Sequence, residues 1–414
     1  MWHPWQLLST LRLPARVLDK VTKKHHKYLD HVTAKLTHNP LLFPEGFFCD
    51  GWGDLQVPTR LNEHLATEDK FRVIEIHELK LVPIPKKRLG VKKPSIVTLQ
   101  GSFATTLRDY QSLLPQVCHS SYFELVLPSN MVVEAENGIK IDGKGQAIVI
   151  LLPGTGEHGC THRRRSIAEP LAKVGVATLV LEGPFYGCRK PADQKGSKLR
   201  RVSDLPILGI TTIEETKSLL EYFKTTFHFD HLVVAGGSMG GLHAAMTAAL
   251  YPGEVGVASW IAPPSAIPPF TRGLLGLSCN WQSLSQQREL AMIDHLLSNQ
   301  VANYAFEQFH HFVHFQIHDE QHDELAQIKQ RLSAFLSLTN IENFPAPRRQ
   351  DAVIFSQATE DQYIGTNEQH WQLARSRWPL AEFRQVTAGH VSGILFETDA
   401  FQKTILDVIK RLKE

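Results

Sequence analysis

The sequence has few cysteines, no excess of charge of either sign and no long hydrophobic run. Its 414 residues include five cysteines, an odd number, scattered without a C-x-x-C pair. This usage argues against a secreted disulfide framework and a structural zinc site, and it indicates a reducing, intracellular compartment. Lys and Arg number 44 against 42 Asp and Glu, a balance without the positive field that binds nucleic acids. We therefore expect no nucleic-acid partner.

No apolar run approaches the roughly 20 residues that span a bilayer, so we expect a chain that is soluble or peripherally associated with a membrane. The N-terminus lacks the small-residue cleavage site of a secretory signal. Between residues 2 and 27, however, six Lys and Arg follow a group of Trp and Leu residues, and Asp19 is the only acid. This asymmetry predicts a segment that lies on an anionic membrane, a mitochondrial-type presequence, or a helix packed on the body with a solvated basic face.

What the sequence does contain, from about residue 121, is a series of short runs rich in β-branched and apolar residues. Most are separated by segments of helical character, which indicates βαβ units and a mostly parallel central sheet with helices on both faces. Residues 401–412 repeat apolar side chains at helical spacing and predict a closing amphipathic helix. The runs are FELVLP (123–128), AIVILL (147–152), VATLVL (176–181), HLVVA (231–235), VASWIA (257–262), AVIFS (352–356) and EFRQV (382–386).

These runs divide the chain into three parts. Residues 1–120 contain helical and irregular pieces and are predicted to form an N-terminal extension packed on the core. Residues 121–262 and 346–414 are predicted to form the α/β core, and residues 263–345, too long for a bare connection, a helical lid insertion.

Within the predicted lid, four histidines recur every fourth residue, a spacing at which a pair can bind a metal. Nearby acids instead indicate a solvated surface, and we expect no metal. The four are His310, His314, His318 and His322.

The segment Gly236-Gly237-Ser238-Met239-Gly240 fits the pattern G-x-S-x-G between a predicted strand and a predicted helix. In that context the glycines leave room for a sharp, strained turn that exposes the serine hydroxyl. The turn also places the Met239 N–H at a helix N-terminus, where it can stabilise an oxyanion. A glycine-rich turn that binds phosphate or only packs is the alternative interpretation.

A nucleophilic serine needs a base, and the base needs an orienting acid. Asp361 follows the run AVIFS, with Glu360 as a less favoured substitute, and His390 follows the run EFRQV. The order Ser, acid, His is that of α/β-hydrolases. A second oxyanion donor is expected from Gly154, Thr155 or Gly156, after the run AIVILL, unless that loop is an ordinary β-turn.

Three consecutive arginines, Arg163, Arg164 and Arg165, follow the oxyanion loop. Their forked donors suit the phosphate of a lipid headgroup, so we treat them, with His158, as candidate substrate-binding residues. The alternative is a solvated helix face on which one arginine pairs with Glu169 or Glu182.

Longer blocks resemble the family of α/β-hydrolase domain-containing protein 18. They include ILLPGTGEHGCTHRRRSIAEPL, VSDL, GGSMGGLHAA, GLSCNWQSL, SQATEDQYI and EFRQVTAGHVSGILF, spread over about residues 121–412. The resemblance implies an α/β-hydrolase fold with Ser238, Asp361 and His390 as the triad. For eukaryotic members it also implies lipid ester hydrolysis, phospholipid deacylation in particular, near mitochondrial membranes. The N-terminal segment departs from the family pattern, and the lid is shorter than in animal members.

Together these observations predict a serine hydrolase that cleaves carboxylic esters through an acyl-enzyme, with no cofactor or metal. A lipid acyl ester is the expected substrate, and the basic N-terminus is expected to contact an anionic membrane peripherally. The alternatives are a thioesterase or small-ester esterase, and a non-catalytic α/β-hydrolase scaffold that binds a lipid or a protein partner.

Overall fold

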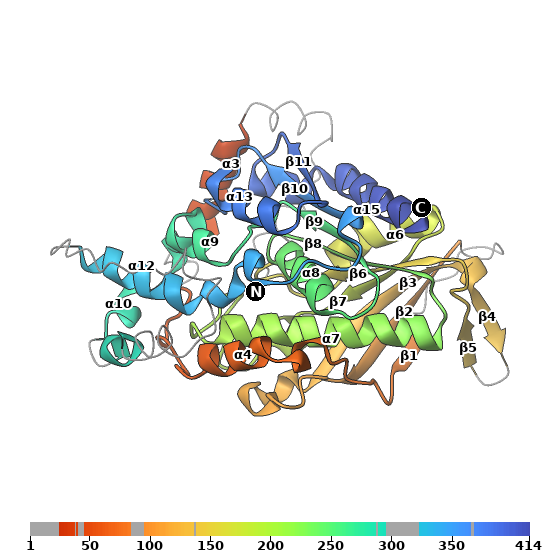
Figure 1. Cartoon of the computed structure of the whole chain (residues 1–414), viewed down its shortest axis with the longest axis horizontal. Coiled ribbons are helices and arrows are strands. Elements are labelled where there is room, and N and C mark those ends of the chain that lie inside the picture. The colour runs from red at the N-terminus through yellow and green to blue at the C-terminus, as the bar shows by residue number, and fades with distance from the viewer. Residues whose placement is uncertain are drawn as a thin grey trace.

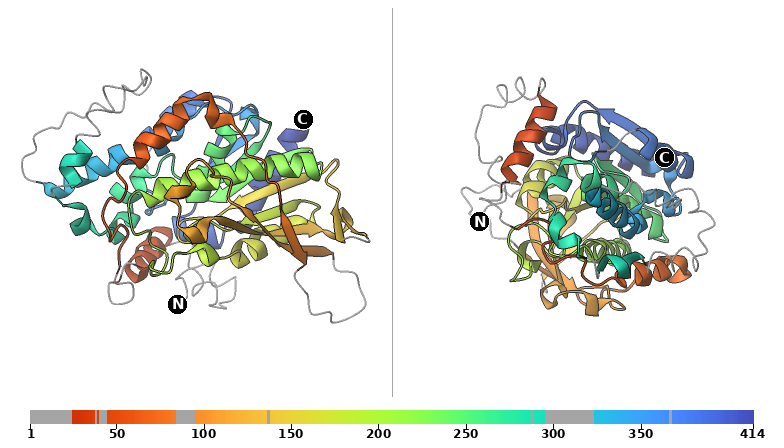
Figure 2. Two further views of the ribbon diagram at one scale, coloured as in Figure 1. Left: turned by 90° about the horizontal axis from the view of Figure 1, so that it is seen from below. Right: turned by 90° about the vertical axis from the view of Figure 1, so that its left-hand side faces the viewer.

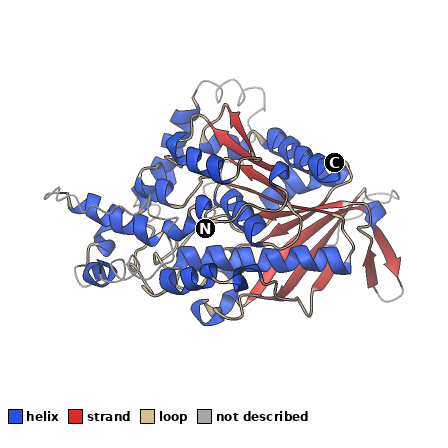
Figure 3. Cartoon of the chain, in the orientation of Figure 1, coloured by secondary structure: helices blue, strands red, loops and turns tan. Residues whose placement is uncertain are grey.

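The computed structural model describes residues 25–37, 39, 45–83, 95–135, 138–286, 289–294, 323–365 and 368–414. Within these residues a nine-stranded sheet has the order β1-β2-β3-β7-β6-β8-β9-β10-β11, and it fans across the molecule in Figure 3. β7 to β11 are parallel to β6, whereas β1, β2 and β3 are joined by antiparallel pairing. The strands are β1 Lys80–Pro83, β2 Ile96–Ala104, β3 Ser120–Pro128, β6 Ala147–Leu152, β7 Ala177–Leu181, β8 His231–Gly237, β9 Gly256–Trp260, β10 Val353–Ala358 and β11 Glu382–Val386, with a separate pair, β4 Val132–Ala135 and β5 Gly138–Ile141.

Helices cover both faces of the sheet, as Figure 1 shows. Long helix α7 and helix α8 lie on one face, and α6 and α15 lie on the other. The helices are α3 His26–Thr37, α4 Val57–Ala66, α5 Thr161–Arg163, α6 Glu169–Lys173, α7 Asp204–Thr226, α8 Met239–Leu250, α9 Ile267–Thr271, α10 Trp281–Leu284, α12 Glu324–Phe335, α13 Glu368–Arg377, α14 His390–Leu395 and α15 Thr398–Lys413.

Strand β6 explains the layering. All six of its side chains are buried, and because successive side chains point to opposite faces, they divide between two cores. Ile148 and Ile150 join the core beneath α7 and α8, and Val149 and Leu151 join the core beneath α6 and α15. An α/β fold with a mostly parallel sheet and flanking helices is thus confirmed, and each of the seven predicted runs forms a strand.

The prediction that residues 1–120 are only an extension of helices and irregular pieces was wrong. Strands β1 and β2 belong to the sheet itself, where β2 pairs with β3 over its full length. Polar residues and a glycine interrupt the apolar alternation of β2. Gly101 is required there, because a Cβ at that position would lie 1.9 Å from the Phe123 ring. β1 lies at the edge of the sheet and ends at Pro83. Proline is tolerated on an edge strand.

In the predicted lid, residues 263–345, the described part is helical and contains no strand. A 3₁₀ turn, Leu274–Ser278, lies between α9 and α10, and two more, Ser337–Thr339 and Ile341–Asn343, follow α12. An aromatic cluster in which Phe47 and Phe48 contact Phe270, and Trp52 contacts Phe335, attaches residues 45–55 to it. The four regularly spaced histidines lie outside the described residues, as do residues 1–24, for which membrane contact is predicted.

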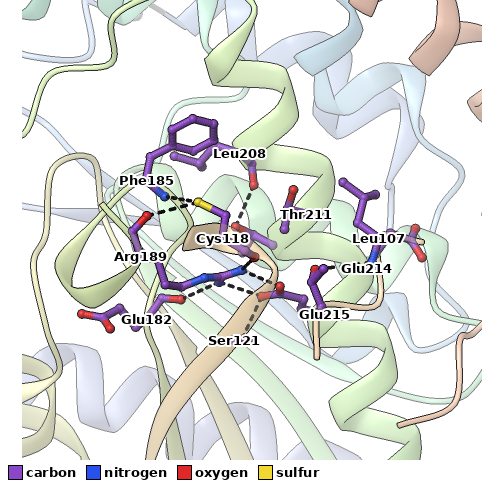
Figure 4. A network of polar contacts seen from close by, with 12 residues as sticks. Leu107, Cys118, Ser121, Glu182, Phe185, Arg189, Leu208, Thr211, Glu214 and Glu215 are labelled. Carbon is purple, nitrogen blue, oxygen red and sulfur yellow. Dashed lines mark hydrogen bonds and ion pairs between the residues drawn. The ribbon is translucent and has the colours of Figure 1, made fainter. Parts of the chain in front are cut away.

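A fully buried ion pair holds the loop after β7 against α7, as Figure 4 shows. The Arg189 guanidinium donates to both carboxylate oxygens of Glu215, at 2.6 and 2.9 Å, and to the carbonyl oxygens of Glu182 and Cys118. Ser121 of β3 donates to the same carboxylate. A charge in a protein interior persists only when it is paired and hydrogen-bonded in this way. The network therefore fixes this loop at the edge of the candidate site.

Among the described residues, no helix is both long and apolar enough to cross a membrane.

Candidate active site

Ser238 occupies a sharp turn between β8 and α8. Its backbone angles, φ 55° and ψ −127°, are strained for a residue with a side chain, at a cost of about 1–3 kcal/mol. The Ser238 N–H donates to the Trp260 carbonyl oxygen at 2.9 Å, which ties the turn to the neighbouring strand β9. The structure thus contains the strained strand-to-helix turn that the sequence predicts.

The flanking glycines make this turn possible. A Cβ on Gly236 would lie 2.4 Å from the Gly240 carbonyl carbon, and a Cβ on Gly240 would lie 2.7 Å from the Leu152 carbonyl oxygen. Real Cβ atoms do not approach other backbone so closely, so any larger residue at either position would push the strand and the helix apart. This steric requirement accounts for the spacing of glycines around Ser238.

The predicted acid and base meet as a buried pair. Nδ1 of His390, the first residue of α14, lies 2.6 Å from Oδ2 of Asp361 in the loop after β10. Oδ1 of Asp361 accepts a hydrogen bond from the Ile364 N–H at 2.9 Å, and the Tyr363 ring stacks on the imidazole with centroids 5.3 Å apart. The imidazole is thereby oriented from its edge and from its face.

Burial lowers the pKa of His390, but the charge and hydrogen bond of Asp361, with a smaller contribution from Asp30, outweigh it. The net pKa is raised above the usual value for histidine. A raised pKa suits a base that must accept a proton from a hydroxyl near neutral pH.

Ser238 and His390 line one cavity, but among the described residues no hydrogen bond joins their side chains. Catalytic hydrogen bonds are often long in unliganded sites and tighten with substrate. Proton transfer between the two side chains would therefore require them to approach each other.

The predicted oxyanion loop lies directly beside the serine. A Cβ on Gly154 would be 3.9 Å from Cβ of Ser238, and Gly154, Thr155, Gly156 and Met239 all line the cavity. The Gly154 N–H, however, already donates to Oε2 of Glu157 at 3.2 Å. This contact favours Thr155 or Gly156 over Gly154 as the second oxyanion donor that the sequence predicts beside Met239 at the start of α8.

His158 lines the cavity, and both of its ring nitrogens are engaged by the protein. Its Nδ1 accepts from the Gly187 N–H at 2.8 Å, and its Nε2 lies 2.9 Å from the Ser197 hydroxyl. Because Nδ1 is an acceptor, Nε2 carries the proton and donates to Ser197. Burial lowers the pKa of His158. These contacts favour a neutral ring that holds the loop, and they do not support the expectation that His158 binds substrate.

Two of the three arginines are also engaged within the protein. Arg163 is buried and donates to Glu157 at 2.8 Å and to the Leu151 carbonyl oxygen at 2.7 Å. Arg164 pairs with Glu124 at 2.7 Å and with Glu169 at 3.2 Å. These contacts count against the expectation that both bind phosphate, because carboxylate and backbone carbonyl oxygens already accept from their guanidinium groups. Arg165 is exposed and lines the cavity.

The cavity has a volume of about 1150 Å³, which is at the upper end for small-molecule sites. Its wall is largely apolar, with contributions from the lid, α8 and α14. Basic residues also line it. Apolar members include Phe47, Leu242, Phe270, Leu275 and Ile394, and basic members include Arg165, Lys190 and Lys198.

Two residues of the site were missed from the sequence. Glu157 holds both Gly154 and Arg163, and Tyr363 stacks on His390. The only usable signal was that Glu157 is an acid close in sequence to the three arginines. Within the described residues, no three His, Cys, Asp or Glu side chains gather as they would around a metal ion.

The chain is similar to a known protein family and to several solved structures. Residues 45–411 match the family model described as alpha/beta hydrolase domain containing 18. An acetyl xylan esterase from Paenibacillus sp. R4 is 13% identical with a TM-score of 0.47, and the match covers 87% of this chain and 97% of that one. The cell wall degrading esterase LipA from Xanthomonas oryzae is 10% identical with a TM-score of 0.44, covering 82% and 100%. At such identities the likeness concerns the fold alone.

Proposed function

Since residues 45–411 match its model, the chain belongs to the alpha/beta hydrolase domain containing 18 family, and we propose that it is a serine hydrolase of carboxylic esters. The observation that carries this proposal is the buried His390–Asp361 pair, whose histidine lines the same cavity as a serine in a strained turn. Ser238, Asp361 and His390 come from different segments, and each follows the carboxyl end of a strand. Parallel sheets form their sites at this edge.

The reaction follows from the positions of these groups. Nε2 of His390 accepts the Ser238 proton as Oγ attacks the ester carbonyl carbon, while Asp361 holds Nδ1–H and stabilises the imidazolium. The oxyanion is stabilised by the Met239 N–H and a second N–H from Thr155 or Gly156. His390 then gives its proton to the departing alkoxide, leaving an acyl-serine. Water, deprotonated by His390, adds to the acyl-serine, and collapse releases the acid and returns the proton to Ser238.

A lipid acyl ester, of the kind that a phospholipid deacylase cleaves, is the substrate class that we propose. The cavity supports this proposal in two ways. Its volume of about 1150 Å³ is larger than an acetyl group requires, and its largely apolar wall suits a long acyl chain. The basic residues on the same cavity suit an anionic headgroup. A small-ester esterase or a thioesterase would use the same groups, so the substrate must be tested separately from the mechanism.

Chain-length dependence tests the apolar part of the cavity. With p-nitrophenyl esters from acetate to octanoate, kcat/KM is expected to rise about 4-fold per methylene until the chain fills the cavity, because each buried methylene contributes about 0.8 kcal/mol. Ile394→Trp, which adds bulk beside Gly237, should end the rise at a shorter chain. Steady-state kinetics measure both effects.

Leu380→Trp is the matched control, because Leu380 is 66% exposed and does not line the cavity, and its profile should equal that of the wild type. A wild-type profile that falls from acetate onward would contradict the lipid proposal and favour a small-ester esterase. Faster cleavage of acyl thioesters than of matched oxygen esters would favour a thioesterase.

Arg165 tests the headgroup part of the proposal. Arg165→Gln is expected to lower kcat/KM for a detergent-dispersed phospholipid about 10-fold, since a hydrogen bond to a charged group contributes about 1.5 kcal/mol. Activity on p-nitrophenyl octanoate should remain unchanged. Lys173→Gln removes an exposed charge of α6 outside the cavity and should leave both substrates unaffected; equal losses in the two variants would refute a specific phosphate contact.

A further inference from the structure

Helix α3 places a second carboxylate beneath the catalytic pair. α3 precedes the region matched by the family model and packs against α14, as the red helix beside the blue C-terminal part in Figure 2 shows. Asp30, in its middle, is 0% exposed. A buried carboxylate is costly unless other groups satisfy its oxygens, so its partners indicate its role.

The partners of Asp30 are the two loops that carry the acid and the base. Oδ2 accepts from the Gln362 N–H, next to Asp361, and from the N–H of His390 itself, both at 3.0 Å. Oδ1 accepts from the Val391 N–H at 2.9 Å. One carboxylate thus connects the residue after the acid to the base and its neighbour. The separation of Asp361 from His390 depends on this shared anchor.

Helix α3 lies in close contact with the turn that carries His390. A Cβ on Gly389 would lie 3.0 Å from Oδ2 of Asp30 and 2.9 Å from the His26 carbonyl oxygen, so only glycine admits the helix at this distance. Nδ1 of His26 lies 2.8 Å from the Ser392 hydroxyl, which in turn accepts from the Gly389 N–H. α3 therefore contacts the His390 turn at several consecutive residues.

We infer that Asp30 is a positioning residue for the catalytic pair, holding the Asp361 loop and the His390 turn in register while adding negative charge beside the imidazole. This inference rests on the proposed serine hydrolase function. Asp30 acts through backbone N–H groups and does not touch the reacting atoms. Its position on α3 makes the N-terminal part of the chain a component of the active site.

The negative charge of Asp30 and its position between the two loops are expected to affect His390 in different ways. The titratable groups that face His390 are Asp361 at Nδ1, Asp30 below its backbone and Tyr363 on its ring face. Burial raises the pKa of Asp30, while its three N–H partners and His390 oppose that rise. Loss of the Asp30 charge lowers the pKa of His390, because Asp30 contributes to raising it. A purely structural contact would not have this effect.

Asp30→Asn tests the inference. Three N–H donors converge on two oxygens, so the Asn amide nitrogen must face at least one donor and shift a loop. We expect kcat to fall about 100-fold, as for a displacement of about 1 Å at a catalytic group, with KM nearly unchanged. We also expect the acid limb of the kcat/KM profile to move to lower pH, because a less basic His390 stays neutral at lower pH. Asp30→Glu, which restores the charge, should restore the position of this limb.

Thr33→Ala is the control, because Thr33 is buried one turn later on the same helix but does not bond the catalytic loops. It should lower Tm and leave kcat and the pH profile unchanged. kcat, KM and the pH profile are measured on p-nitrophenyl octanoate and normalised to the amount of enzyme that a fluorophosphonate labels at Ser238, so partial unfolding of a variant does not hide the result. An unlabelled wild type would overturn the proposed function. A labelled wild type, with Asp30→Asn equal to it in rate and pH limb, would overturn the role of Asp30 alone.

Discussion

Replacing Ser238 by Ala is expected to lower kcat about a millionfold, with KM within a few-fold of the wild type. Loss of the nucleophile from a triad removes nearly all of the rate advantage that the triad provides, and the remainder comes from the oxyanion donors and substrate binding. Ala retains the Cβ and the N–H bond to Trp260, so Tm should not change. The measurements are steady-state kinetics on p-nitrophenyl octanoate and labelling by a fluorophosphonate.

Ser376→Ala is the matched control, since Ser376 is exposed on α13, and it should be labelled and turn over like the wild type. Persistent labelling of Ser238→Ala would show that another residue is the nucleophile. A wild type that is neither labelled nor active would favour the non-catalytic scaffold, in which the cavity serves only to bind a lipid or a protein.

Replacing Asp361 by Asn is expected to lower kcat about 10⁴-fold through the tautomer of His390. Because the Ile364 N–H requires an acceptor, the Asn oxygen will face Ile364 and its NH₂ will face Nδ1 of His390. Nδ1 must then be unprotonated, so Nε2 carries the proton and cannot accept one from Ser238. The raised pKa of His390 depends on the Asp361 charge, so the acid limb of kcat/KM should also move to lower pH.

Glu360→Gln is the control for this assignment, because Glu360 is the adjacent acid that the sequence left as a substitute. It should match the wild type in kcat and in pH profile. A large loss in Glu360→Gln together with a normal Asp361→Asn would reverse the assignment of the acid. The pH profile separates this outcome from general destabilisation, which lowers the amount of active enzyme without moving the limb.

The features predicted well from the sequence are those with a local cause. Strand β6 is marked by six consecutive apolar residues, and the turn at Ser238 by glycines whose positions the backbone requires. Asp361 and His390 could be selected because each follows a late strand in the expected chain order. Strand β2 was missed because its buried positions include Thr98 and Gly101, and the fit of Gly101 depends on Phe123 of the neighbouring strand.

The residues that were misassigned are those whose role depends on distant partners. Arg163 and Arg164 looked like phosphate ligands, yet Glu157, Glu124 and Glu169 neutralise them. The Gly154 amide was a candidate oxyanion donor, but in the folded chain its N–H donates to Glu157. In each case the residue type was compatible with either role, and the neighbouring side chain decided between them.

The amino-acid sequence alone determined seven of the strands, the strained serine turn and the order of the three candidate catalytic residues, because each follows from periodicity or from steric limits within a few residues. Only the tertiary structure decided which polar groups are already engaged and which remain for a substrate. It alone brought Asp30 to His390 across 360 residues of chain. Such contacts depend on the packing of whole helices against loops, and no spacing along the chain encodes that distance.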